Sequence, residues 1–255
     1  MAVHYDGLHF TQVCARRLLE LADLSEGQSV LDVATGTGLV AGVAAQIVGP
    51  HGTVVGVDLS PEMLARAQAK FGGARNLEFH QGDAERLEFP DDCFDVVLCA
   101  SSLFFIPDML GVLRECKRVL KNGGQVGFSS FGASFLQPLN DLWAARLEKY
   151  GVARGPLPTM RLVDPNTCRD LLSQAGFEEV EAHAEQCGYY LPDVNARWAE
   201  MMAGLEGQLL GRLSPDERER VKAEHLEELH QFVTPNGIWV DVSANFAFGR
   251  KPSAT

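Results

Sequence analysis

The sequence predicts an α/β fold built around a mostly parallel β-sheet. Short apolar segments of strand character alternate with segments in which apolar residues recur at helical spacing, and this alternation is typical of parallel sheets. The segment 94–100 is apolar through its centre, as expected for a strand covered on both faces. A chain of 255 residues can bury one full core, so we expect residues 1–255 to form a single domain with insertions.

The alternation begins with a helix over residues 10–24, where the apolar side chains have helical spacing. The first half of the chain then contains, in order, strand 29–34, helix 38–48, strand 53–58, helix 61–70 and strand 77–81. The start of the helix at 61–70 is marked by Ser60, an N-cap residue, and by Pro61 at the first helical position, where a missing N–H costs nothing.

The second half continues the alternation and ends on a strand that follows both a helix and a strand. Its expected elements are strand 94–100, helix 108–120, a turn at 121–124, strand 125–131, a helix from 164 to 176, strand 178–185 and a last strand over 239–249. The expected strands make a seven-stranded sheet, and the place of the last one leaves room for an antiparallel member.

The composition excludes several classes of partner. The chain has 22 lysine and arginine residues against 34 aspartate and glutamate residues, and a net charge of -12 repels phosphate backbones and anionic membranes. We therefore expect neither nucleic acid nor a membrane as a partner. The six cysteines form no Cys-x-x-Cys pair, which indicates reduced thiols, and we assign no metal site. With no secretory start and no apolar run of membrane-span length, we expect a cytoplasmic protein.

The most informative stretch is a short apolar strand at 30–33 that runs into the loop Ala34-Thr35-Gly36-Thr37-Gly38. Gly36 and Gly38 lack a Cβ atom, so the backbone can take positive φ and a ligand can approach the main-chain N–H groups. Asp58 ends the next strand, where a carboxylate can accept hydrogen bonds from vicinal hydroxyls. Together these features indicate a nucleoside-bearing cofactor.

Two cofactor classes use such a loop with an acidic residue about 20 positions on, namely dinucleotides and S-adenosylmethionine. The spacing Gly36-x-Gly38-x-x-Ala41 satisfies a relaxed dinucleotide pattern. Asp32, however, is unfavourable beside a pyrophosphate and suits a cationic amino-acid moiety. Asp83 follows the strand at 77–81, where its carboxylate can accept from an adenine amine. These carboxylates favour S-adenosylmethionine.

The chain therefore resembles the class I S-adenosylmethionine-dependent methyltransferases over about residues 24–250. The Ala-Thr-Gly-Thr-Gly loop and the runs 58–64 and 94–97 are most similar to the branch that includes ubiquinone and menaquinone biosynthesis methyltransferases. The resemblance implies a Rossmann-like sheet. Asn122 replaces the proline of the family's Pro-Gly-Gly turn, a harmless departure because asparagine also favours turns.

The resemblance also implies the roles of individual residues. The loop that begins at Asp32 would hold the methionine part of the cofactor, Asp58 the ribose, and Asp83 with the Ala84 N–H the adenine, which Leu59 and Met63 would flank. The cofactor-binding set it implies is Asp32, Ala34, Thr35, Gly36, Thr37, Gly38, Asp58, Leu59, Met63, Gly82, Asp83, Ala84, Cys99, Ala100 and Tyr5.

Purely structural alternatives remain for several of these residues. Gly36 and Gly38 could be ordinary turn glycines, and we expect Leu59 and Met63 to belong to the core, with an added role beside the adenine. Asp58 could serve only as an acidic residue at a helix N-terminus, and Asp83 could be a surface turn residue. Tyr5 could close over the cofactor or belong to a frayed terminus.

Two segments stand outside the alternation, residues 132–163 and 191–237. Both follow strands of the later half of the sheet, and ligands of open α/β sheets bind beyond the carboxyl ends of strands. We expect helical lid insertions over the second substrate, beside a cofactor-binding core of about residues 25–131. Aromatic and methionine side chains there suit a small hydrophobic or aromatic acceptor, although they would also be ordinary core in helical caps. They are Phe135, Trp143, Tyr150, Met160, Tyr189, Tyr190, Trp198, Met201, Met202 and Phe232.

The resemblance implies an in-line transfer of the sulfonium methyl group, which releases S-adenosylhomocysteine. Alignment of acceptor and methyl carbon is enough for reactive acceptors, so we assign no catalytic base. His183, His225 and His230 qualify only by residue type, and we expect His225 and His230 to be solvated. O-, C- and N-methylation remain open, as does a monomer or homodimer. The rival functions are a non-catalytic binder of S-adenosylmethionine and a nicotinamide-dependent oxidoreductase.

Overall fold

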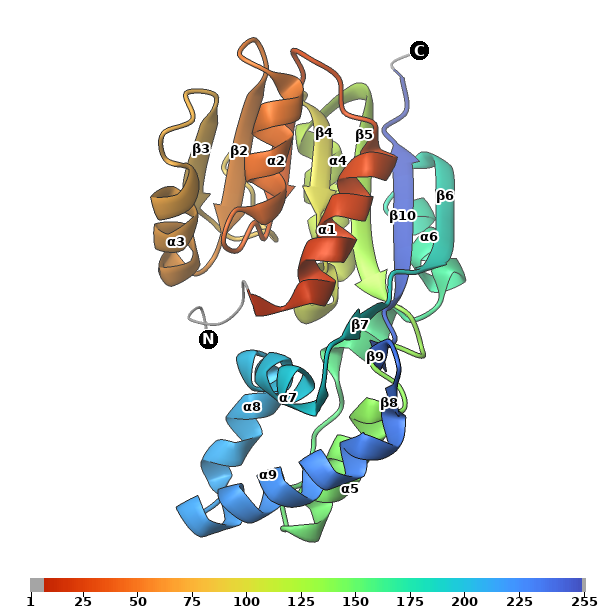
Figure 1. The fold of residues 1–255 in the computed structure, drawn as a ribbon. Coiled ribbons are helices and arrows are strands. Elements are labelled where there is room, and N and C mark those ends of the chain that lie inside the picture. Colours follow the sequence, from red (N-terminus) through yellow and green to blue (C-terminus); the bar gives the residue numbers. More distant parts are fainter. Residues whose placement is uncertain (1–6, 254–255) are drawn as a thin grey trace.

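The computed structural model describes residues 7–253, so Tyr5 lies outside the described residues. Seven strands form one sheet of order β3-β2-β1-β4-β5-β10-β6 (Figure 1). The strands are β1 (Ser29–Val33), β2 (Thr53–Asp58), β3 (Leu77–Gln81), β4 (Phe94–Cys99), β5 (Leu120–Phe131), β6 (Glu178–Gln186) and β10 (Ser243–Arg250). β10 is antiparallel to both of its neighbours, β5 and β6, whereas β1 to β5 pair in parallel. The predicted seven-stranded, mostly parallel sheet with an antiparallel last strand is confirmed.

Helices cover both faces of this sheet. α1 (His9–Ala22) and α2 (Leu39–Val48) lie over one face, and α4 (Met109–Val119) and α6 (Pro165–Gln174) over the other (Figure 1). α3 (Pro61–Phe71) begins as predicted, because the Ser60 side chain accepts a hydrogen bond from Met63 N.

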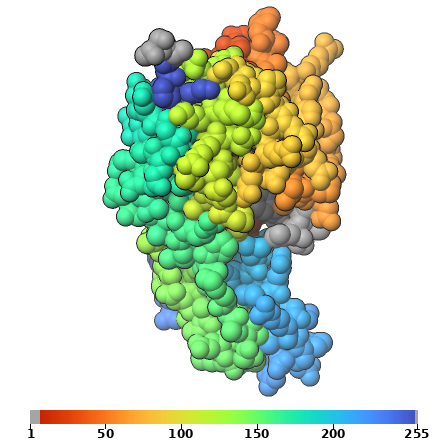
Figure 2. All heavy atoms as spheres, turned by 180° about the vertical axis from the view of Figure 1, so that it is seen from behind, coloured from red at the N-terminus to blue at the C-terminus, as the bar shows by residue number. Residues whose placement is uncertain are grey.

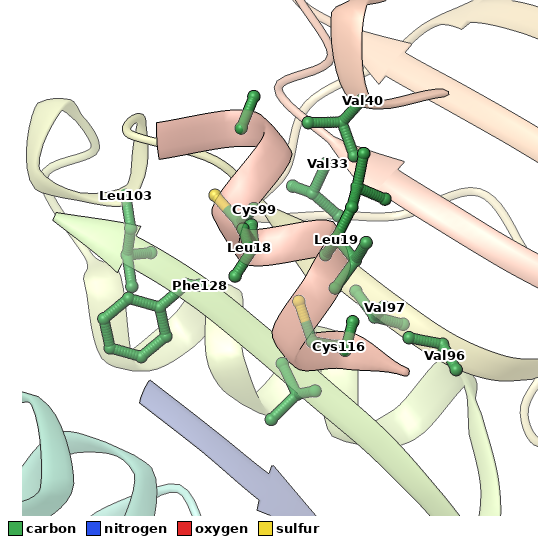
Figure 3. Close-up of a cluster of buried hydrophobic side chains, with 14 of the residues drawn as sticks. Leu18, Leu19, Val33, Val40, Val96, Val97, Cys99, Leu103, Cys116 and Phe128 are labelled. Carbon is green, nitrogen blue, oxygen red and sulfur yellow. The ribbon is translucent and has the colours of Figure 1, made fainter. Parts of the chain in front are cut away.

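The main core lies between these layers. Leu18 and Leu19 of α1 pack onto Val33 of β1 and Val97 of β4, while Cys116 of α4 reaches the same strands from the far face (Figure 3). All of these side chains are buried. The burial of the strands on both faces explains why β4 reads as a continuous apolar run.

The two insertions form a separate helical body beyond the carboxyl ends of the strands (Figures 1 and 2). Its helices are α5 (Leu139–Lys149), α7 (Val194–Ala203), α8 (Leu205–Leu209), η4 (Leu210–Arg212), α9 (Pro215–Leu229) and η5 (His230–Phe232). The short helix η3 (Pro158–Leu162) of the first insertion packs instead on the main core, beside β5, α6 and η2 (Leu103–Phe105), which follows β4. α5 packs beside α9, and Trp143, Leu147, Met201 and Val221 belong to a second buried apolar cluster. Most of the aromatic residues of the insertions therefore belong to apolar cores, as in the alternative that treated them as ordinary core of helical caps.

The prediction of a single last strand over 239–249 was wrong. Residues 237–240 form β9 (Gly237–Val240), which pairs with β7 (Tyr189–Leu191) and β8 (Val233–Thr234) in a separate three-stranded sheet. The chain changes sheet at Asp241, whose carboxylate accepts hydrogen bonds from Ser134 Oγ, Gln186 Nε2 and Ser243 N at 2.8–3.0 Å. These side-chain hydrogen bonds take the place of β-sheet hydrogen bonds at the break. The alternation of apolar and polar residues in the sequence runs on from β9 into β10 and does not mark the break.

The turn predicted at 121–124 lies inside β5, because Leu120 already pairs with Phe94 of β4. The register between the two strands then shifts so that Val96 pairs with Gln125. Residues 121–124 therefore bulge out of the pairing between β4 and β5, with Gly123 at a φ of 76°. Across residues 7–253, no helix combines the length and apolar character needed to cross a membrane.

Candidate functional site

A pocket lies where β1 and β4 end, under the N-terminal half of α1. Its lining residues are Thr11, Ala15, Asp32, Ala34, Thr35, Gly36, Thr37, Leu39, Val40, Ala100 and Ser101. Four of the five predicted loop residues, Ala34 to Thr37, therefore converge on one hollow together with Asp32 and Ala100, as the topology of a doubly wound sheet requires. Gly38 does not line it and instead precedes α2.

The backbone around this pocket is conformationally unusual. Gly36 and Gly38 have φ values of 57° and 80°, and two residues with side chains, Ala34 and Ser101, are also left-handed at 55° and 48°. Gly38 has a second reason to lack a side chain, because a Cβ atom there would lie 2.9 Å from the Phe79 ring. Left-handed residues other than glycine are costly and cluster at ligand sites, so this strained backbone marks the pocket as functional.

Asp32 lies beneath the glycine loop and is almost fully buried, with 1% of its surface exposed. Its Oδ2 atom accepts hydrogen bonds from Thr35 Oγ1 at 2.6 Å and from Ala41 N at 3.0 Å. Burial raises the pKa of Asp32 to about 7, with these two bonds opposing the shift and the charge of Asp58 adding to it. Asp32 therefore fixes the loop, and a cation near it would stabilise its charged form.

Asp58 ties the same loop to the end of β2. Its Oδ2 atom accepts from Gly36 N at 2.8 Å, and its Oδ1 atom accepts from Ser60 N at 2.9 Å. Each carboxylate oxygen has a further lone pair, so Asp58 can still accept hydrogen bonds from a diol. The reading of Asp58 as only a helix-terminal acidic residue is incomplete, because it also anchors the glycine loop.

The residues predicted to surround the adenine lie one step further along the sheet edge. Gly82 N donates to the Asp58 carbonyl at 3.1 Å, which places the segment after β3 beside the tip of β2. The expectation that Leu59 belongs to the core was wrong, because this residue directly follows β2 at the sheet edge and is 69% exposed, a state that suits covering a flat ring. Asp83 is exposed, and its Oδ1 accepts from Glu85 N at 2.9 Å.

The remaining predicted residues are placed as follows. Met63 is half-buried at the start of α3, and Ala84 is half-buried against the main core. Thr37 is buried and lines the pocket. Cys99 is buried at the end of β4, where burial raises the pKa of its thiol well above its usual range. It therefore lies behind Ala100 and does not line the pocket.

The sequence interpretation missed five of the lining residues. Thr11 and Ala15 come from α1, and Leu39 and Val40 from the first turn of α2. Ser101 lies two positions after the end of β4, and its N–H donates to Ser129 O at 3.2 Å and Ser129 Oγ at 3.0 Å. A hydroxyl residue just past the strand predicted at 94–100 was the available signal for Ser101.

The expectation that His225 is solvated was wrong. Its side chain packs against Trp143 and Trp198 in the helical body, and 1% of its surface is exposed. Burial, helped by the charges of Arg197 and Arg146, lowers the pKa of His225 to about 4. His230 is exposed as expected, and His183 on β6 contacts Glu185 at 3.0 Å. None of the three lines the pocket at the glycine loop.

A second cavity of about 190 Å³ begins directly after β5. It is lined by Gly132, Ala133, Phe135, Gln137, Asn140, Asp141, Arg154, Leu157, Thr159 and Met160. The Phe135 ring of this cavity contacts Phe10 of α1, the helix that also supplies Thr11 and Ala15 to the glycine-loop pocket.

Comparison with known proteins supports one family. The family model described as a methyltransferase domain matches residues 31–128. The ubiquinone/menaquinone biosynthesis C-methyltransferase UbiE of Pseudomonas putida is 32% identical over 197 residues, which cover 69% of this chain and 75% of the relative.

Two solved structures share the fold at lower identity. The YcgJ protein of Bacillus subtilis has a TM-score of 0.62 at 21% identity, covering 96% of this chain and 100% of that chain. Phosphoethanolamine N-methyltransferase 2 of Haemonchus contortus, in complex with S-adenosyl-L-methionine, has a TM-score of 0.54 at 20% identity, covering 94% of this chain and 52% of that chain.

The order of the sheet and its likeness to YcgJ give the chain a Rossmann-like fold. Because its identity to UbiE extends over most of both chains, the chain belongs to the class I S-adenosylmethionine-dependent methyltransferases and is related to the ubiquinone/menaquinone biosynthesis C-methyltransferases. S-adenosylmethionine is its cofactor. The nicotinamide alternative is thereby set aside.

Proposed function

We propose that the chain transfers the methyl group of S-adenosylmethionine to a small, hydrophobic or aromatic acceptor that binds between the strand ends and the helical insertions. The observation that carries this proposal is the cavity of about 190 Å³ after β5, one aromatic contact away from the glycine-loop pocket. Its size suits a single ring, since a cavity of about 150 Å³ accommodates benzene.

The cofactor site is proposed from the predicted residues. The left-handed loop at Gly36 has no Cβ atom at that position and so leaves room for a ligand beside the main chain, and Asp32 would offer a buried negative charge to a cationic amino acid. Asp58 would hold the ribose, while Leu59 and Asp83 would contact the adenine. These donors and acceptors fit S-adenosylmethionine, which supplies an electrophilic methyl group when bound.

The chain contributes alignment and exclusion of water. Phe10, Phe131 and Phe135 pack on one another with ring-centroid separations of 3.8–5.6 Å, and Phe135 lines the cavity after β5. An apolar lining of this kind would exclude water from the acceptor, and holding both reactants in line accounts for much of the acceleration of a displacement. We propose no catalytic base, because none of His183, His225 and His230 lines either pocket.

Carbon is the acceptor atom to test first, because the relatives similar to this chain are C-methyltransferases. The experiment incubates the purified protein with S-adenosylmethionine carrying a ¹³C-methyl group and a panel of one-ring phenols, quinols and aromatic amines. Release of S-adenosylhomocysteine measures turnover, and the ¹³C chemical shift of the product identifies a C-, O- or N-methyl group. We expect turnover with an aromatic member of the panel.

Methylation confined to charged peptides or RNA would contradict this function. Binding of S-adenosylmethionine without turnover on any acceptor would support the rival function, a non-catalytic cofactor-binding protein. A variant with Phe135→Trp, which fills the cavity, is expected to lower turnover while the affinity for the cofactor stays within about twofold of wild type.

A further inference from the structure

Two cysteines contact each other at the edge of the main core, outside both pockets. Cys14 lies on α1, and Cys187 lies in the connector, residues 187–188, between β6 and β7. Their thiol groups are free and hydrogen-bond with each other. Cys14 is fully buried in the core, whereas Cys187 is half-buried and packs against it. One thiol of the pair is therefore open to solvent and the other lies behind it.

Contacts on either side fix this pairing, since α1 and the segment 185–189 lie antiparallel. Arg17, one turn after Cys14, donates two hydrogen bonds of 2.7 and 2.9 Å to the carboxylate of Glu185. Near the start of α1, the centroid of the His9 ring lies 5.6 Å from that of Tyr189. The order 9, 14, 17 along the helix thus matches the order 189, 187, 185 along the other segment. The contact between the thiols is part of an extended register.

The half-buried thiol is the more reactive of the two. Cys14 donates its S–H to the Cys187 sulfur, which lowers the pKa of Cys187 and raises the pKa of Cys14. The guanidinium of Arg17 also lowers the pKa of Cys187, while burial and the carboxylates of Glu185 and Glu20 oppose the shift. Because the thiolate is the nucleophile, oxidation follows thiolate character and exposure. Cys187 combines both.

The other four cysteines lack this combination. Three of them are buried, namely Cys99, Cys116 and Cys168. Cys93 is half-buried, but burial raises the pKa of its thiol, which donates to the Pro90 carbonyl at 3.1 Å. Cys93 therefore matches Cys187 in exposure and differs from it in thiolate character.

We propose that Cys14 and Cys187 are an oxidation site, at which a peroxide closes a reversible disulfide between α1 and the connector. The Cys187 thiolate attacks hydrogen peroxide and gives up two electrons. The O–O bond breaks, one oxygen stays on the sulfur as a sulfenic acid, and the other leaves as hydroxide. The Cys14 thiol then attacks the Cys187 sulfur, the S–O bond breaks, and water leaves with the Cys14 proton. A dithiol reductant restores both thiols by exchange.

The disulfide joins two parts of the molecule that bear on function. α1 supplies Thr11 and Ala15 to the glycine-loop pocket, and Cys14 directly precedes Ala15. The connector leads through β7 toward the second insertion. The cross-link would therefore fix the helix beside the cofactor pocket to the start of that insertion. The chemistry of the pair goes beyond the proposed function and does not depend on it.

The test treats the reduced wild-type protein with hydrogen peroxide and maps its peptides by mass spectrometry without reduction. We expect one peptide pair linked through Cys14 and Cys187, and return of both thiols after dithiothreitol. Cys187 should react about tenfold faster than Cys93, because its thiolate is more populated. The oxidised protein should also unfold at a higher urea concentration than the reduced protein, since the cross-link constrains the unfolded chain.

Variants separate the two steps. Cys187→Ser should abolish the cross-link and leave Cys14 reduced, because that thiol is buried. Cys14→Ser should leave Cys187 as a sulfenic acid, which dimedone traps. Cys93→Ser removes the other half-buried thiol and is the matched control, with the same yield of cross-link as wild type. Cooperative urea denaturation establishes that each variant is folded.

Four results would overturn the proposal. They are absence of the linked peptide pair in oxidised wild-type protein, oxidation of Cys93 as fast as that of Cys187, a disulfide that joins two chains, and an unchanged yield of cross-link in Cys187→Ser. Each is measured on peptides or chains without any turnover. Failure of methyl transfer is therefore distinguishable from failure of this proposal.

Discussion

At the scale of single residues, two carboxylates hold the glycine loop in its conformation. Asp32 and Asp58 each accept a loop hydrogen bond, so the two carboxylates shape the loop before any ligand arrives. The sequence predicted both acidic residues from their positions at strand ends. It could not predict their bonds to the loop, because those depend on where Thr35 and Gly36 turn.

The affinity for S-adenosylmethionine should depend on pH through Asp32. The pKa of Asp32 is raised to about 7, so below pH 7 the free protein holds a proton there that a cationic ligand must displace. Affinity should therefore rise about tenfold from pH 6 to pH 8, with proton release near pH 7. Calorimetry in buffers of different ionisation enthalpy measures both quantities. Asp32→Asn should abolish the pH dependence, and an equally steep profile in that variant would exclude Asp32 as its source.

The two loop glycines should tolerate alanine differently. Gly36→Ala adds a Cβ atom with no neighbour within 4 Å, so only the left-handed backbone opposes it, at about 1–2 kcal/mol. Gly38→Ala adds the contact with the Phe79 ring at 2.9 Å, so its loss of unfolding free energy should exceed that of Gly36→Ala by about 1–3 kcal/mol. Urea denaturation compares them. Equal losses would mean that packing at Gly38 is unimportant.

At the scale of elements, the strand and helix pattern was readable because apolar periodicity is local. The start of α3 at Ser60 and Pro61 came directly from residue type. The break between β9 and β10 did not, since it depends on side-chain bonds of Asp241 to residues more than 50 positions away. The burial of His225 was not predicted, because α9 is rich in glutamate and its sequence does not indicate that one face packs on Trp143.

The helical body should lose stability in mild acid because of His225. Its pKa is about 4 in the folded protein and about 6.5 in the unfolded chain, so the unfolded chain binds more protons between these values. The stability from neutral His225 is fully present above pH 6.5 and decreases as the pH falls toward 4, by about 3 kcal/mol at most. Urea denaturation at pH 7.5 and pH 5 measures the free energy of unfolding. Its loss on acidification should be smaller for His225→Phe than for the wild-type protein. The same loss in both proteins would assign the acid sensitivity to other groups.

At the scale of the whole molecule, a conserved type of sheet carries a cofactor pocket, and the insertions supply a helical body beyond it (Figure 1). The seven strands and the antiparallel last one could be predicted, because the alternation of elements is readable along the chain. The cavity after β5 could not be predicted, because its lining residue Arg154 is held by Glu206 from the other insertion.

The central claim, a S-adenosylmethionine site at the ends of β1, β2 and β3, is tested most directly by calorimetric titration with S-adenosylmethionine and S-adenosylhomocysteine. We expect micromolar binding of both to the wild-type protein, which corresponds to about -8 kcal/mol. Asp58→Ala and Asp83→Ala should each weaken binding of both ligands, and Asp216→Ala, an exposed site on α9, should not. Absence of binding to the wild-type protein, or unchanged affinity in both site variants, would contradict the account.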